Sequence, residues 1–258
     1  MTTSNQTLTS DQLNQFRDNG FVNVGQIVSD DELAMINREY DRLVTMEAQT
    51  LGNEKQGRFP YRAMLNFRSP ELKGIIQHPP LLLAMVQLLG EDVRFWWDQG
   101  INKSPGAGSF IAWHQDNGYQ QGQTPEYVTC WMALDDSSPE NGGLYVVPGS
   151  HKNGRHEHEW QTVHAVIPDG IVNTDNAVPL NAKAGDLLLF SSFLVHQTVG
   201  NKTTDQQRRA WVIQYCRGDQ RNEATGEVYD NRPWVVQKGE LVAEPWSERK
   251  FDMRGDRP

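Results

Sequence analysis

The sequence predicts a mainly β protein with helices added ahead of the strands, folded as a sandwich or a double-sheet jelly roll. After Gly90 the chain breaks into short runs rich in β-branched and aromatic residues, which clusters of Gly, Pro, Asn and Asp separate. No helical pattern lies between these runs, and this argues against a parallel α/β sheet. Before Gly90 the apolar residues recur instead at helical spacing.

Three helices are expected before the strands. The first begins at Ser10 and ends at Gly20, a plausible C-terminal glycine. The second begins after Ser29, which has the capping-box spacing to Glu32, and continues for about four turns. The third covers residues 81–89, is apolar almost all round and is introduced by a pair of prolines, so we expect a short buried helix.

Five runs are expected to form strands, the last of them opened by Arg208: residues 93–98, 127–134, 143–147, 187–190 and 210–216. Residues 1–8 have the character of a mobile tail. The polar, glycine-punctuated interval 50–68 is expected to be a loop that orders over a ligand. Residues 218–258 are expected to form an irregular segment on the surface. A chain of 258 residues fits one domain of this class, so we expect residues 1–258 to be a single domain.

The amino-acid composition limits the classes of binding partner and the cellular compartment that we expect for this protein. The formal net charge of −9 argues against nucleic acid, because affinity for a phosphate backbone comes from clustered Lys and Arg. No stretch approaches the ~18 apolar residues of a membrane span, and the polar N-terminus has no apolar signal core. Cys130 and Cys216 lie in apolar runs, where buried free thiols are expected. We therefore expect a soluble, cytoplasmic protein. Its oligomeric state cannot be read from the sequence.

A His and a carboxylate two residues apart, followed far downstream by a second His, form the pattern of a metal site. Here these residues are His114, Asp116 and His196. A hard carboxylate oxygen with two imidazole nitrogens suits Fe(II) and leaves about three of six octahedral positions open. The triplet alone also arises in loops, where the histidine only hydrogen-bonds the aspartate. His196 follows an apolar strand and Arg208 opens the next one, and this context favours iron.

These motifs resemble the phytanoyl-CoA dioxygenase family of Fe(II)- and 2-oxoglutarate-dependent oxygenases, over about residues 10–217. Residues 113–116 (WHQD) are similar to its first metal motif, and His196, Asn201 and Arg208 to its closing motif. Three segments resemble its middle section: 131–136, 140–142 and 147–151. The resemblance implies a double-stranded β-helix, a jelly roll related to the cupins, with N-terminal helices packed on the barrel and iron at its open end.

The resemblance also implies roles for individual residues. His114, Asp116 and His196 would hold Fe(II), and Arg208 would pair with the distal carboxylate of 2-oxoglutarate. Three residues stand where relatives contact the cosubstrate: Gln99, Trp131 and Thr198. Gln99 and Thr198 depart from the Met and Ser expected there. A lysine that relatives place before the first strand has no clear counterpart in residues 61–67.

Strand alternation distinguishes Arg208 from Arg209. Arg208 shares its face with Ala210 and Val212, which leave room for a cosubstrate, whereas Arg209 shares its face with bulky aromatic and aliphatic residues. A guanidinium can bind a carboxylate through two parallel hydrogen bonds, which also sets the direction of the ligand. We therefore expect Arg208 to bind the cosubstrate and Arg209 to be a surface or supporting arginine.

The expected reaction uses O2 to oxidise an unactivated C–H bond of a small-molecule metabolite, most simply by hydroxylation, with release of succinate and CO2. An aspartate at position 116 favours hydroxylation, desaturation or ring closure over halogenation. Substrate-contacting candidates near the metal motif are Trp97, Asn117 and Tyr119. His156 and His158 imitate a metal motif, but their charged context predicts a solvated loop.

Three alternatives remain open at this point. A cupin-like metalloenzyme could use the same ligands without 2-oxoglutarate, although it would have no need of Arg208. A non-catalytic metal- or ligand-binding β-barrel would produce no succinate. A demethylase of nucleic acid or protein on the same scaffold is disfavoured by the acidic charge.

Overall fold

Two antiparallel sheets lie face to face in the computed structural model, which describes residues 8–51, 61–120, 125–161 and 164–243. The large sheet contains, in spatial order, β1 (Phe21–Gln26), β10 (Asp186–Ser191), β5 (Val128–Ala133), β12 (Arg208–Arg217), β3 (Val93–Lys103), β13 (Trp234–Gln237) and β14 (Glu240–Leu241), with β2 (Tyr61–Ala63) also paired to β3. The small sheet has the order β4 (Ile111–His114), β11 (His196–Thr198), β6 (Leu144–Val146) and β9 (Val178–Leu180). A separate hairpin joins β7 (Glu159–Gln161) to β8 (His164–Val166).

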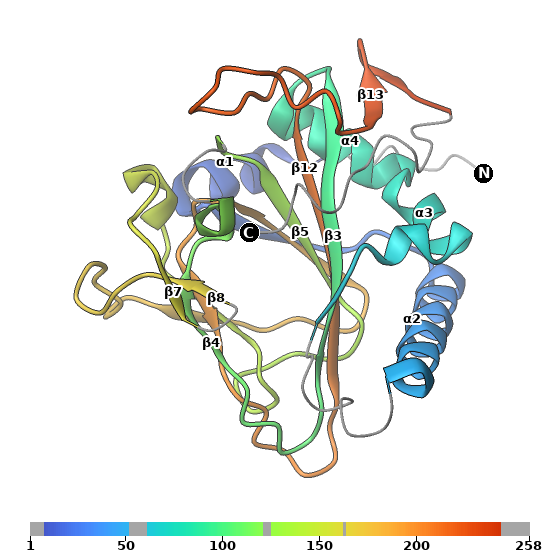
Figure 1. Ribbon diagram of the computed structural model, residues 1–258, viewed down its shortest axis with the longest axis vertical. Helices are drawn as coiled ribbons and strands as arrows, with labels where there is room; N and C mark the ends of the chain where they lie inside the picture. Colours follow the sequence, from blue (N-terminus) through green and yellow to red (C-terminus); the bar gives the residue numbers. More distant parts are fainter. Residues whose placement is uncertain (1–7, 52–60, 121–124, 162–163, 244–258) are drawn as a thin grey trace.

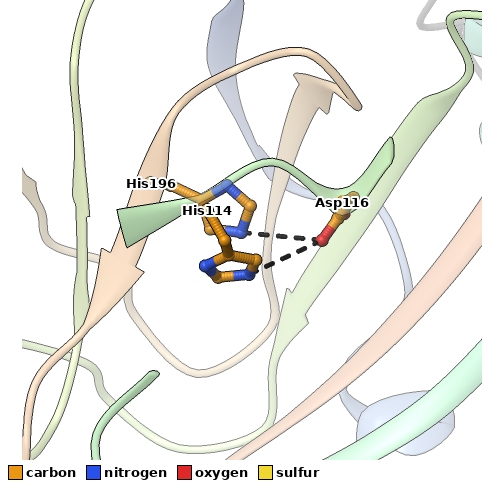
Figure 2. Close-up of side chains that lie close together, drawn as sticks. All are labelled: His114, Asp116 and His196. Atoms are coloured by element: carbon orange, nitrogen blue, oxygen red, sulfur yellow. Dashed lines mark ion pairs between the residues drawn. The ribbon is translucent and has the colours of Figure 1, made fainter. Parts of the chain in front are cut away.

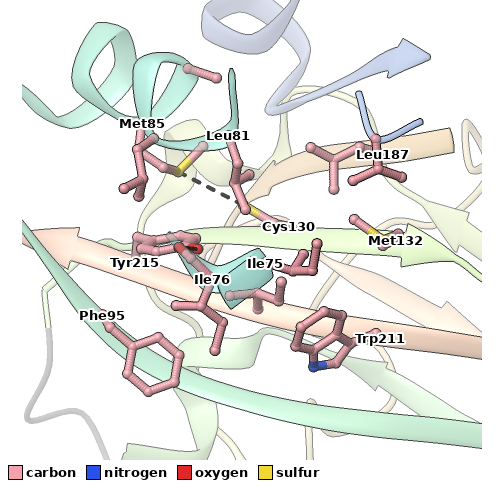
Figure 3. Packing of buried hydrophobic residues seen from close by; sticks show 14 of the residues in the cluster. Ile75, Ile76, Leu81, Met85, Phe95, Cys130, Met132, Leu187, Trp211 and Tyr215 are labelled. Atoms are coloured by element: carbon pink, nitrogen blue, oxygen red, sulfur yellow. Dashed lines mark hydrogen bonds between the residues drawn. The ribbon is translucent and has the colours of Figure 1, made fainter. Parts of the chain in front are cut away.

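Alternation along β12 divides the interior into two cores. Ala210 and Val212 pack in a cluster between the sheets, together with Trp131 from β5 and Leu144 from β6. Trp211, Ile213 and Tyr215 point to the opposite face and pack under the helices. Figure 3 shows Trp211 and Tyr215 in this cluster. The large sheet is therefore buried on both faces, and this explains why its central strands read as nearly continuous apolar runs.

The helices cover the outer face of the large sheet. They are α1 (Ser10–Asn19), α2 (Asp30–Leu51), α3 (Pro70–Ile76) and α4 (Pro79–Leu89). In Figure 1, α2, α3 and α4 lie on the side of the molecule opposite to β4 and the β7–β8 hairpin. Their apolar residues join the sheet in one cluster; for example, Met85 of α4 contacts Cys130 of β5 (Figure 3). The double-stranded β-helix with helices packed against it is confirmed.

Local signals set the helix ends. Thr9 caps α1 through a capping box with Gln12, and Gly20 ends the helix in the left-handed region at φ 84°. Helix α2 continues for 22 residues and is therefore longer than the four turns expected. Strand β2 and a short 3-10 turn, Leu65–Phe67, occupy part of the interval 50–68 that was expected to be a loop over a ligand, and helix α3 begins just after it. Residues 52–60 of that interval lie outside the described residues.

Two further expectations need correction. Residues 218–258 are not wholly irregular, because β13 pairs with β3 and forms a hairpin with β14; residues 244–258 lie outside the described residues. Leu8, expected in the tail, is buried, and its backbone N–H donates to the Gln87 side chain at 2.6 Å. Residues 1–7 of that tail are not described. The strand β1 was not expected, and it pairs with β10 along the edge of the large sheet.

Across the described ranges, no single helix is both long and apolar enough to cross a bilayer. The bent pair formed by α3 and α4 reaches that length and apolarity only when the two helices are taken together.

Candidate metal centre and adjoining cavity

The register of the small sheet brings the two candidate histidines together. His196 of β11 lies directly opposite His114 of β4 in the antiparallel ladder, and their ring centroids are 4.1 Å apart. Asp116 begins a 3-10 turn, Asp116–Gln120, two residues after His114. Figure 2 shows both imidazole rings turned toward one carboxylate oxygen, Asp116 Oδ1, which lies 3.9 Å from His114 Nε2 and 3.6 Å from His196 Nε2.

Backbone carbonyls fix which nitrogen of each histidine faces this cluster. His114 Nδ1 lies 2.8 Å from the Ala112 carbonyl, and His196 Nδ1 lies 3.0 Å from the Leu194 carbonyl. A carbonyl only accepts, so each Nδ1 carries the hydrogen and each Nε2 presents a lone pair to the cluster. Burial, with the nearby His196, holds the pKa of His114 well below its usual value, so its ring is neutral as a metal ligand must be.

Hydrogen bonds to one oxygen of the Asp116 carboxylate fix its orientation. Its Oδ2 accepts hydrogen bonds from Thr129 Oγ1 at 2.5 Å and from Gln214 Nε2 at 3.1 Å, which leaves Oδ1 directed at the histidines. Both donors belong to strands of the large sheet, β5 and β12. Hydrogen bonds of this kind restrict a ligand's orientation and so support metal affinity. The three candidate ligand atoms lie within 4.8 Å of one another, a spacing that one ion could bridge.

The segment around His156 and His158 is a loop, as expected, but it lies against the metal motif and is not fully solvated. His158 is half-buried, and its Nε2 accepts the backbone N–H of Gln115 at 3.1 Å, between two of the ligands. Gln115 in turn donates to the Gly154 and Phe193 carbonyls. The charged residues around His158 did not predict this contact. It forms because the fold brings His158 next to Gln115, which lies 43 positions earlier in the chain.

A cavity of about 190 Å³ opens beside the cluster, between the two sheets. Besides the three candidate metal ligands, five of the sequence candidates line it: Trp97, Gln99, Tyr119, Trp131 and Thr198; Arg208 does not. The phenol of Tyr119 also lies 3.0 Å from His164 Nδ1 at the cavity wall. Asn117, by contrast, does not line the cavity. It is buried, donates to the Pro125 carbonyl and accepts from Arg155, so the structure places it in the support of a turn.

Arg208 and Arg209 point to opposite faces of β12, as alternation predicts. Arg209 forms a two-pronged hydrogen bond with Asp135 and an ion pair with Asp41. Arg208 is fully buried and donates from Nη2 to the Gly142 carbonyl at 2.5 Å, while its Nε and Nη1 have no hydrogen-bond partner. Burial lowers the pKa of Arg208 to about 10, so the guanidinium stays charged at neutral pH.

Sequence reasoning missed one cation beside this arginine. Lys103 ends β3 directly opposite Arg208, is 1% exposed and lines the cavity. Its ammonium donates to Thr198 Oγ1 at 2.8 Å. The strand expected at residues 93–98 stops short of this position, and only the strand's real extent to Lys103 places it beside Arg208.

The unpaired donors show what these residues can hold. Arg208 offers two buried nitrogens, Nε and Nη1, whose hydrogens have no partner, and the indole Nε1 of Trp131, in the cavity wall, is also buried without a partner. Burying such donors unsatisfied is unfavourable, so a ligand rich in acceptor oxygens fits here. A carboxylate matches the guanidinium fork, and the His-Asp-His cluster matches Fe(II). The residues present therefore fit both an iron ion and a 2-oxo acid.

Comparisons with known proteins agree with this chemistry. The family model described as phytanoyl-CoA dioxygenase (PhyH) matches residues 16–210. The chain is 36% identical over 104 residues to phytanoyl-CoA dioxygenase 1 of Oryza sativa subsp. japonica, covering 39% of this chain and 37% of that protein. It is 27% identical over 225 residues to the peroxisomal phytanoyl-CoA dioxygenase of Mus musculus, covering 78% of this chain and 67% of that protein.

A solved structure supports the fold. The chain is similar to the non-heme monooxygenase ThoJ in its apo form, with a TM-score of 0.70 and 25% identity over 93% of this chain and 90% of that one. The family model covers most of the chain, including both metal motifs and the start of β12. On this evidence the chain belongs to the phytanoyl-CoA dioxygenase family of Fe(II)- and 2-oxoglutarate-dependent oxygenases.

Proposed function

We propose that this protein hydroxylates a small organic molecule with Fe(II), 2-oxoglutarate and O2. One observation carries the proposal: a His-Asp-His donor cluster lines a cavity whose wall also contains Trp131 with its unpaired indole N–H, and the guanidinium of Arg208, with further unpaired N–H groups, lies 5.7 Å from the ring of that tryptophan. The cluster suits iron with open coordination positions, and the N–H groups suit the carboxylate of a cosubstrate. Family membership supports the same assignment.

Each side chain has a defined task in this proposal. Nε2 of His114, Nε2 of His196 and Oδ1 of Asp116 would hold the iron. Arg208 and Trp131 would orient the cosubstrate through their free N–H groups. Gln99 and Thr198 line the cavity and complete its cosubstrate end. When bound, iron and 2-oxoglutarate would supply the oxidising power that inserts oxygen into a substrate C–H bond, with succinate and CO2 as co-products.

The chain's remaining contribution is orientation and exclusion of water. Phe190 packs against the His196 ring at 5.0 Å between centroids, and the T-shaped contact of Tyr119 with His114 covers a second edge of the cluster. These apolar contacts keep the ligands in one orientation and limit solvent around them.

The proposed substrate is a small free metabolite that contacts Trp97 and Tyr119 in the cavity wall. Asn117 is withdrawn from the substrate-contacting set because it does not line the cavity. A nucleic-acid substrate is not proposed for a chain of net charge −9. We place the reaction in the cytoplasm, where the buried free thiols of Cys130 and Cys216 suit reducing conditions. The proposal treats residues 1–258 as one catalytic domain, because ligands and supporting residues come from both sheets.

The deciding experiment measures succinate formed from 2-oxoglutarate. The full chain is loaded anaerobically with Fe(II) and 2-oxoglutarate, exposed to oxygen and compared with a His196→Ala variant. We expect slow succinate formation without added substrate in the native protein and none in the variant. Turnover that rises when a metabolite is added would then identify the substrate.

Binding separates the competing functions. Absence of both succinate and 2-oxoglutarate binding would contradict the proposal and favour a cupin-like metalloenzyme that uses another cosubstrate. Binding of iron and 2-oxoglutarate with no succinate, even in the presence of a broad set of metabolites, would instead indicate a non-catalytic binding barrel.

A further inference from the structure

Aromatic side chains gather at the end of the cavity where β3 has a bulge. In the β3–β12 ladder, Trp97 and Phe95 face successive residues of β12. Trp96, between them, has no partner in that described strand. A bulge of this kind redirects a side chain. Trp96 and Trp97 consequently both line the cavity, whereas regular alternation would turn one of them away.

The aromatic end of the cavity, formed by Trp96, Trp97 and Tyr127, lies beside the metal cluster. Gln214, which faces Trp97 in the ladder, donates to the Asp116 carboxylate at 3.1 Å. The ring of Tyr127 is stacked on Trp96, with centroids 5.6 Å apart. A substrate within reach of the metal would therefore meet flat aromatic walls, and these favour an aromatic ring packed against them.

The aromatic end offers no free charge to a substrate. Among the described residues that line the cavity, Lys103 is the only Lys or Arg and Asp116 the only Asp or Glu. Lys103 lies six residues from Trp97 along β3, about 20 Å away, and Asp116 belongs to the metal cluster. Arg232 packs on the Trp96 ring but is 2% exposed and does not line the cavity. An ionic substrate would lose hydration here without gaining an opposite charge, so an uncharged one is favoured.

His164 supplies a neutral polar group in the same cavity wall. Its Nδ1 lies 3.0 Å from the phenol of Tyr119, whose ring packs edge-on against the His114 ring. Burial, with the charge of Lys103, lowers the pKa of His164, so its imidazole is neutral near pH 7. Its Nε2 has no hydrogen-bond partner in the part of the chain that the structure describes. A neutral imidazole nitrogen donates to or accepts from a hydroxyl, carbonyl or amide group, according to its tautomer.

The hairpin formed by β7 and β8 holds His164 in this position. Just beyond β8, the backbone N–H of Ile167 donates to the Trp113 carbonyl at 2.8 Å, one residue before the ligand His114. Figure 1 shows β7 and β8 beside β4, the strand that carries this ligand. His164 therefore reaches the cavity through strand packing and not through its place in a sequence motif.

We propose that the substrate is an uncharged molecule with an aromatic ring, which packs against Trp96 and Trp97 while its hydroxyl, carbonyl or amide group hydrogen-bonds to Nε2 of His164. The inference rests on the proposed function and adds the chemical class of the molecule that is oxidised. An acyl thioester of coenzyme A does not belong to this class, because its phosphates carry several negative charges.

The first test keeps the ring constant and varies its charge. Calorimetry measures the binding of three kinds of ligand to full-length protein loaded with Ni(II) and 2-oxoglutarate: the two naphthols, the two naphthoates and the two naphthylmethylammonium ions. We expect at least one naphthol to have a dissociation constant about tenfold or more below that of every charged ligand. A naphthoate, a naphthylmethylammonium ion or octanoyl-CoA that binds as tightly as the better naphthol would overturn the inference.

Variants then test the two contacts separately. Trp97→Leu keeps an apolar side chain but removes the ring, and it is expected to weaken naphthol binding about fivefold or more, while Trp97→Phe keeps most of the affinity. His164→Leu is expected to weaken naphthol binding about threefold or more and to leave the binding of naphthalene, which has no polar group, within about twofold. His78→Leu is the matched control, since His78 precedes α4 on the helix-covered face of the large sheet.

The outcomes distinguish this inference from the proposed function. Unchanged naphthol affinity in Trp97→Leu, or equal losses for naphthol and naphthalene in His164→Leu, would contradict the inference. If Trp97→Leu does not fold, the charge series and the His164 comparison still decide it. Failure of the native protein to bind 2-oxoglutarate would overturn the proposed function, whereas a protein that binds 2-oxoglutarate but neither naphthol would overturn the substrate class alone.

Discussion

Two neighbouring arginines on β12 have different surroundings because their side chains point to opposite faces of the strand. Arg208 enters the space between the sheets, where its Nε and Nη1 have no partner, and Arg209 turns outward to Asp135 and Asp41. The same residue type therefore serves ligand binding at one position and stability at the next. Burial and available partners, not residue identity, make the difference.

This contrast gives a paired prediction. Arg208→Gln is expected to weaken 2-oxoglutarate binding by about a hundredfold while the protein stays folded, because the charge-assisted bonds to the carboxylate are lost. Arg209→Gln is expected to lower the free energy of unfolding by about 1–3 kcal/mol, since it breaks the half-buried pair with Asp135, and to leave the affinity within about twofold. Calorimetry and urea unfolding measure the two effects. The reverse pattern would show that the arginine roles are exchanged.

Individual site residues could be predicted from the sequence where residue type and spacing together form a pattern. The spacing of His114 and Asp116, with the distant His196, predicted the metal ligands, and strand alternation separated Arg208 from Arg209. Lys103 was not predicted, because an isolated lysine near the end of a strand has no local feature that distinguishes it from an exposed one. Its significance comes from Arg208, which lies 105 positions away in the chain and opposite it in the sheet.

Among the elements, β3 has the most demanding position, since one face borders the cavity and the other supports α2. Gly100 lies where Tyr40 of α2 packs against the strand, and a Cβ there would be 2.5 Å from the Tyr40 ring. The bare Cα therefore allows the helix to approach the strand that carries Gln99 and Lys103. Glycine is therefore required at position 100 for the close approach of Tyr40, and not for a left-handed backbone conformation.

Gly100→Ala is expected to lower the free energy of unfolding by about 1–3 kcal/mol, because the buried tyrosine ring must shift. Gly74→Ala is the matched control: it lies in α3 with nothing within 4 Å of an added Cβ, and it is expected to stabilise the protein by about 0.5–1 kcal/mol. Urea unfolding of both variants checks the pair. Equal effects of the two changes would contradict the packing argument.

Element type was easier to predict than element extent. The end of α1 at Gly20 and the start of α2 after Ser29 were predicted because these residues act locally, whereas α2 continues to Leu51, past its expected length. The strand β1 was missed because its short run, interrupted by Asn23 and Gly25, becomes a strand only through pairing with β10. The same holds for β13, which gains its strand conformation from β3.

At the scale of the whole molecule, the proposed site links both sheets, so its occupation should stabilise the entire fold. Iron and 2-oxoglutarate each bind only the folded chain, and a ligand at a hundred times its dissociation constant contributes about 2.7 kcal/mol. Adding Ni(II) with 2-oxoglutarate is therefore expected to raise the melting temperature by roughly 5 °C or more, and a chelator should reverse the rise. A thermal scan measures it, with His196→Ala as the control. An equal rise in that variant would place the metal elsewhere.

The sequence by itself determined the fold class, the end of α1, the start of α2 and the three candidate metal ligands. These follow from periodicity, capping chemistry and motif spacing. The resemblance to a family implied that an arginine meets the cosubstrate, and strand alternation selected Arg208 over Arg209. Only the tertiary structure decided that Lys103 faces Arg208, that His158 supports Gln115, that Asn117 lies outside the cavity and that Gly100 receives a tyrosine. Each of these depends on strand register and on packing between segments far apart in the chain, and no local pattern encodes them.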